Sequence, residues 1–270
     1  MSSRTELVTP ELLHAWKLPR PGDSKYGRGE VRVVGGSMSS PGAVMLAATA
    51  ALRVGAGRLA LVVDGRVAAS VAVAMPESAV TALESLDAAA DADATLFGPG
   101  LDDAALTAEL LRALAAAPTD QVMVLDAFAL GVLAGVDVSG WRGRLVLTPN
   151  KVEAALLLGI DEDQLELERD VARIALRYGA VVSCYGIVSD GDRMLRITEG
   201  GAGLGTSGSG DVLAGAITGL AARGASPLQA AVVGTWAHAA AGDRLEHRIA
   251  PVGFLARELV DELPTVLATL

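Results

Sequence analysis

The chain has 270 residues, enough to bury one large core, and its 51% apolar and 20% charged residues exclude disorder as its main state. Its net charge of −10 argues against a general nucleic-acid-binding protein, although a helix N-terminus can still hold a small anion locally. The first residues carry acids and no secretory signal, and arginines and glycines break the longest apolar stretch at 43–63, so we expect a cytoplasmic protein without membrane contact.

Strand-like and helix-like segments alternate along the chain without a linker or an internal repeat. The patterns predict strands at 31–34, 58–63, 94–97, 122–125, 145–147 and 180–184, and a further strand at 193–197 after the turn Asp190-Gly191-Asp192. They predict helices at 43–54, 106–116, 152–158, 165–178, 211–223, 226–245 and 253–263. This alternation is typical of a single α/β domain over residues 1–270, with a mostly parallel central sheet covered by helices on both faces.

The ends of the predicted strands share a polar, glycine-rich character. They carry Gly35-Gly36-Ser37, Gly98-Pro99-Gly100, Asp126, Thr148-Pro149-Asn150 and the segment before Asp211. Ligands of open parallel sheets bind beyond the carboxyl ends of the strands. The sequence therefore predicts a ligand site at this edge of the sheet.

Residues 200–215, which read GGAGLGTSGSGDVLAG, are the most informative stretch, because six of the eleven residues from 200 to 210 are glycines. Glycines let backbone N–H groups converge on an anion, and the following helix adds its positive dipole end. Asp211 would then accept a proton from a substrate hydroxyl while the amides of Ser209 and Gly210 stabilise the transferring group. The alternative is that Asp211 only complements the helix dipole and that the glycines form a flexible loop. The stretch is neither a Walker A loop nor a dinucleotide-binding fingerprint.

The segment T-S-G-S-G-D-V-L-A-G at 206–215 resembles the signature of ribokinase-like kinases, and the other landmarks resemble one branch of them, the ADP/ATP-dependent NAD(P)H-hydrate dehydratases. The landmarks follow in order from about residue 8 to the end. They include Lys25, Gly29 and Gly35-Gly36-Ser37, then Pro41-Gly42-Ala43, 50–57, 74–77, 98–101, 125–127, 147–153 and 238–243.

The resemblance implies a ribokinase-like fold and a lyase that repairs hydrated NADH and NADPH. In such enzymes ADP or ATP phosphorylates the hydroxyl that water has added to the nicotinamide ring, Mg²⁺ bridges the donor phosphates, and loss of phosphate restores the ring. The resemblance also implies small-molecule substrates only, and a homo-oligomer that is a tetramer. The residues implied for catalysis and for hydrate binding are Asp211, Ala43, Gly100 and Asn150, and those for nucleotide binding are Tyr185, Gly186, Ser207, Gly208, Ser209 and Gly210.

Two positions depart from the family pattern. Asn150 stands where the family has His, so a titrating imidazole is absent there. Tyr185-Gly186 replaces Lys-Gly, which removes a lysine suited to the nucleotide phosphates. Neutralisation of phosphate must then come from other groups, and Tyr185 is either a hydrogen-bond donor to the nucleotide or a packing residue.

Other polar residues receive structural interpretations. We expect Lys25 to be solvated rather than to face a phosphate, and Asp126 to cap the next helix rather than to orient a group of the site. Glu153 is expected to be structural. His238 and Asp243 are expected to form a hydrogen-bonded pair on one helix. Cys184 lies in an apolar run and is expected to be a buried, inert thiol.

Two other functions stay open at this point. One is a kinase of the same fold for a thiazole or pyrimidine alcohol, which would use Asp211 in the same way and release the phosphorylated product. The other is a non-catalytic nucleotide-binding module, against which the carboxylate beside a phosphate site argues.

Overall fold

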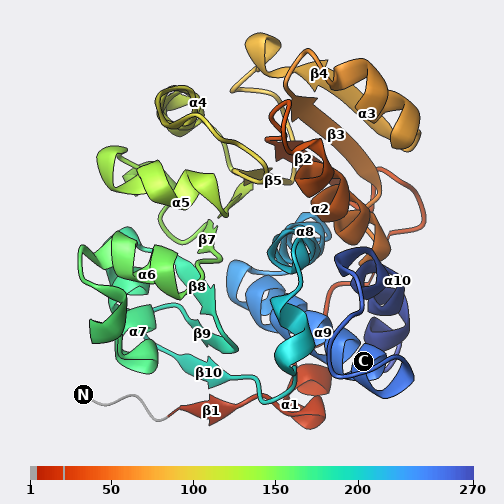
Figure 1. The fold of residues 1–270 in the computed structure, drawn as a ribbon, viewed down its shortest axis with the longest axis vertical. Coiled ribbons are helices and arrows are strands. Elements are labelled where there is room, and N and C mark those ends of the chain that lie inside the picture. The colour runs from red at the N-terminus through yellow and green to blue at the C-terminus, as the bar shows by residue number, and fades with distance from the viewer. Residues whose placement is uncertain (1–4, 21) are drawn as a thin grey trace.

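The computed structural model describes residues 5–20 and 22–270, whose strands form one ten-stranded sheet (Figure 1). The strand order is β1-β10-β9-β8-β7-β6-β5-β2-β3-β4, and only β9 runs antiparallel to its neighbours. The mostly parallel sheet predicted from the sequence is therefore confirmed. The strands are β1 (Glu6–Leu7), β2 (Glu30–Val34), β3 (Arg58–Val63), β4 (Ser78–Ala82), β5 (Ala94–Phe97), β6 (Val122–Leu125), β7 (Leu145–Leu147), β8 (Val181–Cys184), β9 (Ile187–Ser189) and β10 (Met194–Arg196).

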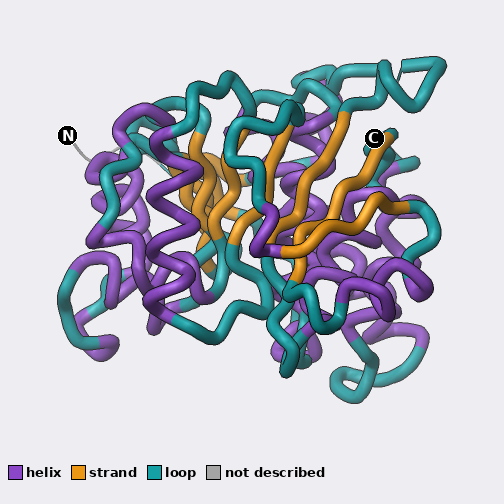
Figure 2. The backbone as a smooth tube through the Cα atoms, turned by 90° about the horizontal axis from the view of Figure 1, so that it is seen from above, coloured by secondary structure: helices purple, strands orange, loops and turns teal. Residues whose placement is uncertain are grey.

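Helices cover both faces of the sheet, and Figure 2 shows the strands running between two groups of helices. One face carries α2, α8, α9 and α10, and the other carries α4 to α7. The helices are α1 (Pro10–Ala15), α2 (Pro41–Arg53), α3 (Ala68–Ala74), α4 (Ala104–Ala116), α5 (Phe128–Val132), α6 (Lys151–Leu158), α7 (Leu167–Tyr178), α8 (Ser209–Ala222), α9 (Pro227–Arg248) and α10 (Ala256–Leu267).

Each central strand contributes to two hydrophobic cores, because successive side chains of a strand point to opposite faces. Leu96 packs in the core under α2, α8, α9 and α10, whereas its neighbour Phe97 packs in the core under α4 to α7. Val33 and Val34 divide in the same way, and all four side chains are fully buried. Burial on both sides explains why these strands read as uninterrupted apolar runs in the sequence.

The predicted elements are all present, and four strands, β3, β5, β6 and β7, have the predicted bounds. The predicted hairpin turn at 190–192 is also confirmed, since it joins β9 to the antiparallel β10. The sequence did not predict β1, β4, β9, α1, α3 and α5. Strands β1 and β4 lie at the edges of the sheet, β9 has only three residues, and the three helices are too short to show a clear helical period.

Helix α8 lies at the centre of the fold (Figure 1). It contacts α2 and α9 at its sides and strands β2, β5 and β6 beneath it, and nearly all of its residues from Val212 onward are buried. Its first turn stands beyond these strands at their carboxyl ends. The N-terminus of α8 therefore lies at the edge of the sheet where the sequence predicts a ligand site.

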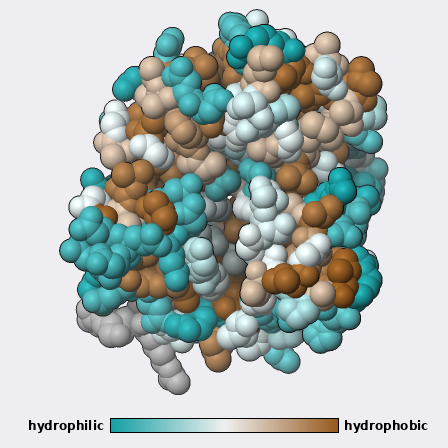
Figure 3. Space-filling model, viewed as in Figure 1, coloured by the Kyte–Doolittle hydropathy of each residue, from teal (hydrophilic) through white to brown (hydrophobic). Residues whose placement is uncertain are grey.

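No helix of the described residues is long and apolar enough to cross a membrane. Hydrophilic residues gather on one side of the surface, over α6 and α7 (Figure 3). In α7 the side chains of Arg169 and Arg173 are about half exposed.

Candidate active site

Four of the polar strand ends meet at one edge of the sheet. Strands β7, β6, β5 and β2 are consecutive neighbours and all run parallel, so their carboxyl ends lie side by side. These ends carry Thr148–Asn150, Asp126, Gly98–Gly100 and Gly35–Ser37, in that order across the sheet. The clustering predicted from the sequence is confirmed.

Ala43 and Gly100, the two residues expected near a substrate, lie against each other. Gly100 has φ +67°, and a Cβ placed there would lie 3.1 Å from the Ala43 Cβ and 2.4 Å from the carbonyl oxygen of Ser40. The loops after β2 and β5 are joined by backbone bonds, including one of 2.8 Å in which the Ser37 N–H donates to the Gly100 carbonyl. A side chain at position 100 has no room, so this corner of the site is lined by backbone and one methyl group.

The first turn of α8 offers free backbone donors. Gly208 precedes it with φ +87° and caps it without a side chain, and the N–H of Ser209 donates to the Thr206 carbonyl at 3.2 Å. Within the described chain, the N–H groups of Gly210 and Asp211 have no hydrogen-bond acceptor. These two amides, and not that of Ser209, are the ones available to an anion.

Ser209 anchors this turn to the rest of the fold. Its buried hydroxyl lies 2.9 Å from Nε2 of His238 on α9, and burial lowers the pKa of that imidazole to about 4, which keeps the ring neutral. The predicted pair of His238 and Asp243 is wrong, because Asp243 accepts a hydrogen bond from the Gly200 N–H at 3.0 Å instead.

The carboxylate of Asp211 lies beside the free amides. Its Oδ2 is 3.8 Å from the place that a Cβ on Gly208 would take, so the side chain folds back over the turn that precedes the helix. Burial raises the pKa of Asp211 from its ordinary value to about 6. A carboxylate with this pKa is ionised near neutral pH and is a stronger base than an exposed aspartate.

A second carboxyl group, that of Asp126, lies at the same edge. The Thr148 hydroxyl donates to its Oδ1 at 2.7 Å, and the side chain is only 6% exposed. Burial, helped by the negative charges of Glu153 and Asp211, raises the pKa of Asp126 to about 8. The expected capping role is wrong, since no side chain caps α5. The sequence indicated the position of this carboxyl group, because Asp126 directly follows a buried strand.

Asn150 begins α6 and takes part in a reciprocal cap. Its Oδ1 accepts from the Glu153 N–H at 2.9 Å, and the Glu153 carboxylate accepts from the Asn150 N–H at 2.8 Å. The structural role expected for Glu153 is confirmed. The exposed side-chain amide group of Asn150 keeps its two N–H donors for a ligand, because only its oxygen is used by the cap.

Tyr185 and Gly186 form the two-residue turn between β8 and β9, with φ values of +49° and +76°. The Tyr185 side chain is 65% exposed, and the Nζ of Lys151 lies 4.8 Å from the centre of its ring. The packing role left open for Tyr185 is therefore limited to this contact with Lys151. Among the described residues, no hydrogen bond joins the Tyr185 side chain to the first turn of α8.

The remaining glycines of the 200–210 segment do not form an anion-binding loop. A short 3-10 turn occupies Ala202–Gly205, and a Cβ on Gly203 would lie 2.3 Å from the Phe254 ring. Gly200 is similarly close to Leu204. Gly200 and Gly203 permit close packing, and of the glycines in this segment only Gly208 and Gly210 belong to the turn with free amides.

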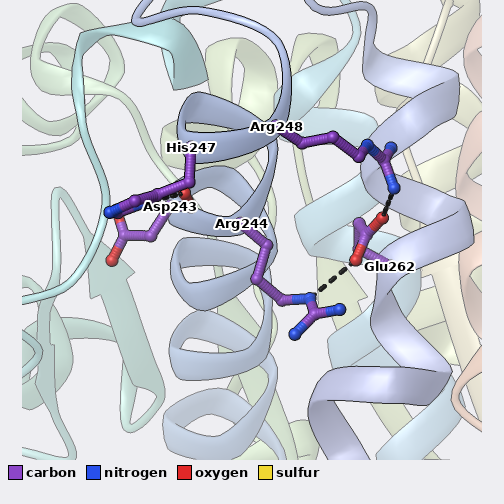
Figure 4. Close-up of a pocket in the computed structure, with 5 residues that line it drawn as sticks. All are labelled: Asp243, Arg244, His247, Arg248 and Glu262. Carbon is purple, nitrogen blue, oxygen red and sulfur yellow. Dashed lines mark hydrogen bonds and ion pairs between the residues drawn. The ribbon is translucent and has the colours of Figure 1, made fainter.

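Two other charged groups lie away from this edge. Lys25 precedes β2 and packs its backbone against Gly57 before β3, at the amino ends of these strands, so its expected solvated role is confirmed. A surface hollow between α9 and α10 holds Arg244 and Arg248, which both pair with the buried Glu262 (Figure 4). These ion pairs join α9 to α10, so we assign the cluster a structural role.

The buried thiol predicted at Cys184 is confirmed, with 1% exposure and a pKa raised by burial to about 12. Over the described ranges, no group of three or more His, Cys, Asp or Glu side chains is placed to hold a metal ion.

In a comparison with protein families, the model of NAD(P)H-hydrate dehydratase matches residues 31–265. The ADP-dependent (S)-NAD(P)H-hydrate dehydratase of Xanthomonas campestris is 43% identical over 289 residues, covering 98% of this chain and 96% of that protein. The bifunctional NAD(P)H-hydrate repair enzyme of Moorella thermoacetica is 38% identical over 271 residues. That match covers 91% of this chain and 50% of the relative, so the chain spans about half the length of the bifunctional protein.

Solved structures share the fold. A ribokinase-like superfamily protein from Enterococcus faecalis has a TM-score of 0.86 at 24% identity, covering 98% of this chain and 96% of its own. The ADP/ATP-dependent NAD(P)H-hydrate dehydratase from Bacillus subtilis, co-crystallized with ATP/Mg²⁺, has a TM-score of 0.85 at 23% identity and covers 98% of both chains. The ribokinase-like α/β fold expected from the sequence is confirmed.

Proposed function

This chain belongs to the family of NAD(P)H-hydrate dehydratases, and from this membership and the geometry of the strand ends we propose which of its residues carry the reaction. The enzyme restores hydrated NADH and NADPH to the dihydronicotinamides, with a nucleotide as phosphoryl donor. The whole chain acts as one domain. Because the relative from Xanthomonas campestris is ADP-dependent and acts on the (S) hydrate, we assign ADP and the (S) hydrate to this chain as well.

Asp211 is the general base of the first step. Its carboxylate takes the proton of the ring hydroxyl while that oxygen attacks the terminal phosphorus of the nucleotide. The bond from this phosphorus to the bridging oxygen breaks, so that AMP leaves when ADP is the donor. The free N–H groups of Gly210 and Asp211 stabilise negative charge on the transferring group. The observation that carries this assignment is the position of a partly buried carboxylate, with its pKa raised to about 6, beside two unpaired amides of one helix turn.

Elimination follows from the substrate's own chemistry. The carbon–oxygen bond breaks with the electron pair leaving on phosphate, the lone pair of the ring nitrogen assists, and loss of a proton from the adjacent carbon restores the double bond. Ala43, Gly100 and Asn150 hold the hydrate, the first two as a close-fitting wall and the third through its free amide donors.

The nucleotide lies on the other side of Asp211. Its phosphates approach the first turn of α8, and its remaining part faces the β8–β9 turn. The nucleotide-side residues are Ser207, Gly208, Ser209, Gly210, Tyr185 and Gly186. Ser209 acts by anchoring the turn, because its hydroxyl is hydrogen-bonded to His238 and its N–H already donates to the Thr206 carbonyl. Mg²⁺ bound through the phosphates and water would neutralise charge on the donor. We also propose a cytoplasmic homotetramer as the working state.

The test uses hydrated NADH with ADP or ATP, and it follows the return of the dihydronicotinamide absorbance. We expect Asp211→Asn to lower kcat by about two orders of magnitude or more while ADP still binds, because a positioned base is removed without a change in shape. The matched control is Asp192→Asn, an exposed turn residue between β9 and β10, which should retain full turnover. Undiminished kcat in Asp211→Asn would remove Asp211 from the chemistry.

A further inference from the structure

The strand-end edge of the sheet is poor in positive charge. The segments that follow the strands there, together with the first turns of the helices they lead to, contain only two basic residues, Arg66 and Lys151. Their acidic residues include Asp64, Asp102, Asp103, Asp126, Glu153, Glu199 and Asp211. Arg66 already forms an ion pair with Asp64, whereas none of the ion pairs found in residues 5–20 and 22–270 includes Lys151. Lys151 is therefore the basic residue at this edge whose charge is left for a ligand.

Lys151 is held in place by an aromatic ring. Its Nζ lies 4.8 Å from the centre of the Tyr185 ring, within the range at which a cation is attracted to an aromatic face. Tyr185 reaches this position because it adopts φ +49° in its two-residue turn, a conformation that Asn or Gly normally takes. Tyr185 in the β8–β9 turn and Lys151 at the start of α6 thus form a cation–π pair.

The pair lies on the same edge as the proposed base. Strands β7 and β8 are parallel neighbours with Leu147 opposite Val182, so Lys151 and Tyr185, which follow these strands, stand side by side. The charge of Lys151 also acts on the neighbouring Cys184, and the charges of Glu153 and Asp211 both act on Asp126. Asp126 is therefore near both Asp211 and the first turn of α6, which begins with Lys151 and contains Glu153.

An anionic donor needs a cation here, because the protein carries a net charge of −10 and the edge itself is acidic. We infer that Lys151, positioned by the Tyr185 ring, binds a phosphate of the nucleotide donor and supplies the positive charge that the β8–β9 turn itself does not carry. An ammonium serves phosphate as a compact point charge. The inference rests on the proposed function for its donor, and it adds a binding residue from a different element.

The competing role for Lys151 is a purely local one. Lys151 also lines a hollow of about 620 Å³ with Glu162, Asp163, Leu165 and Leu167, where it would only balance two acidic residues. The two roles make different predictions for ADP, which separates them experimentally.

The test compares Lys151→Met with Lys25→Met, which removes the same charge at the opposite edge of the sheet. We expect Lys151→Met to raise the KM for ADP and the Kd of ADP measured by calorimetry about tenfold or more, with the KM for hydrated NADH changed less than about twofold. Lys25→Met should leave all three unchanged. Unchanged ADP constants in Lys151→Met, or an equal rise in the KM of both substrates, would overturn the inference.

A double variant tests whether charge or packing matters. Lys151→Met combined with Tyr185→Lys moves the ammonium into the turn, and we expect it to recover most of the lost ADP affinity. If the double variant binds ADP as weakly as Lys151→Met does, Lys151 does not act through its charge. The calorimetric Kd of ADP keeps this test separate from the proposed function, which fails only if wild-type protein does not restore the dihydronicotinamide.

Discussion

At the scale of single residues, the site depends on how Asp211 resolves a conflict. The first turn of α8 favours an anion, and a carboxylate placed there competes with phosphate for the same donors. In the structure the Asp211 side chain folds back toward Gly208, and the N–H groups of Gly210 and Asp211 stay free for an anion. Partial burial then gives the carboxyl a pKa of about 6, which suits a base near neutral pH.

This pKa predicts an acidic limb in the activity profile. Only ionised Asp211 can accept the hydroxyl proton, so kcat/KM should rise with pH and level off above an apparent pKa of about 6. Steady-state rates measured across this pH range, with the stability of the protein checked at each pH, would show the limb. The residual activity of Asp211→Asn should lack it. A limb near the ordinary aspartate value of 3.8 would show that burial does not tune this group.

At the scale of elements, the distance between the hydrate side and the base is set by helix packing. The site residues Ala43 and Asp211 lie in the first turns of α2 and α8, and these two helices pack against each other. Their contact is very close: a Cβ on Gly215 would lie 2.0 Å from the Ala47 carbonyl oxygen, and one on Gly219 would lie 2.6 Å from that of Ala51. Glycines at these positions let two backbones approach where side chains would separate them.

Gly215→Ala should therefore separate α2 from α8. We expect it to destabilise the fold by about 1–3 kcal/mol through overpacking, and to lower kcat because Asp211 shifts relative to Ala43. The control is Gly131→Ala in α5, where a Cβ meets nothing within 4 Å and the better helix propensity should add up to about 1 kcal/mol. Urea denaturation measures both variants. Equal stabilities for the two would contradict a role for this contact.

The sequence predicted the central elements well because their environment is uniform. Strands β3, β5, β6 and β7 consist mainly of buried apolar residues, and runs of this length are typical of buried strands and too short for an ordinary helix. The edge strand β4 was missed since its alternate residues are partly exposed and small. Helix α5 was missed because it has only five residues and starts after Ala127, which has φ +51°.

Within the site, the sequence indicated positions better than partners. Two aspartates could be found from the sequence. Asp126 directly follows a buried strand, and Asp211 lies in the first turn of a buried helix. The hydrogen bond between Ser209 and His238, and the packing of Gly203 on Phe254, were not visible, since both depend on which distant segments the fold brings together. A glycine for packing and a glycine for anion binding look the same in a sequence.

At the scale of the whole molecule, two buried acidic groups make the stability of the fold depend on pH in opposite directions. Hydrogen bonds from Arg169, together with Arg173, lower the pKa of Asp170 to about 2, so this group stabilises the fold above its unfolded value and the contribution is lost as the pH falls toward 2. Burial raises the pKa of Asp126 to about 8, and the contribution of its neutral form is lost as the pH rises through that value. Ionisation of Asp126, at the strand-end edge of the sheet, thus reduces the stability of the fold in alkaline solution.

Asp126 should dominate the loss of stability between about pH 6.5 and about pH 8, since Asp211 has already ionised by then. The folded state binds one proton more than the unfolded state in this range, which lowers the free energy of unfolding by up to about 1.4 kcal/mol per pH unit. Asp126→Asn keeps an oxygen for the Thr148 hydroxyl and cannot ionise, so its free energy of unfolding should stay nearly constant over this range. Urea denaturation of both proteins at the two pH values measures the slopes, and Asp192→Asn should retain the wild-type slope. If Asp126→Asn loses stability as steeply as the wild type, the alkaline sensitivity belongs to the overall negative charge and not to this buried carboxyl.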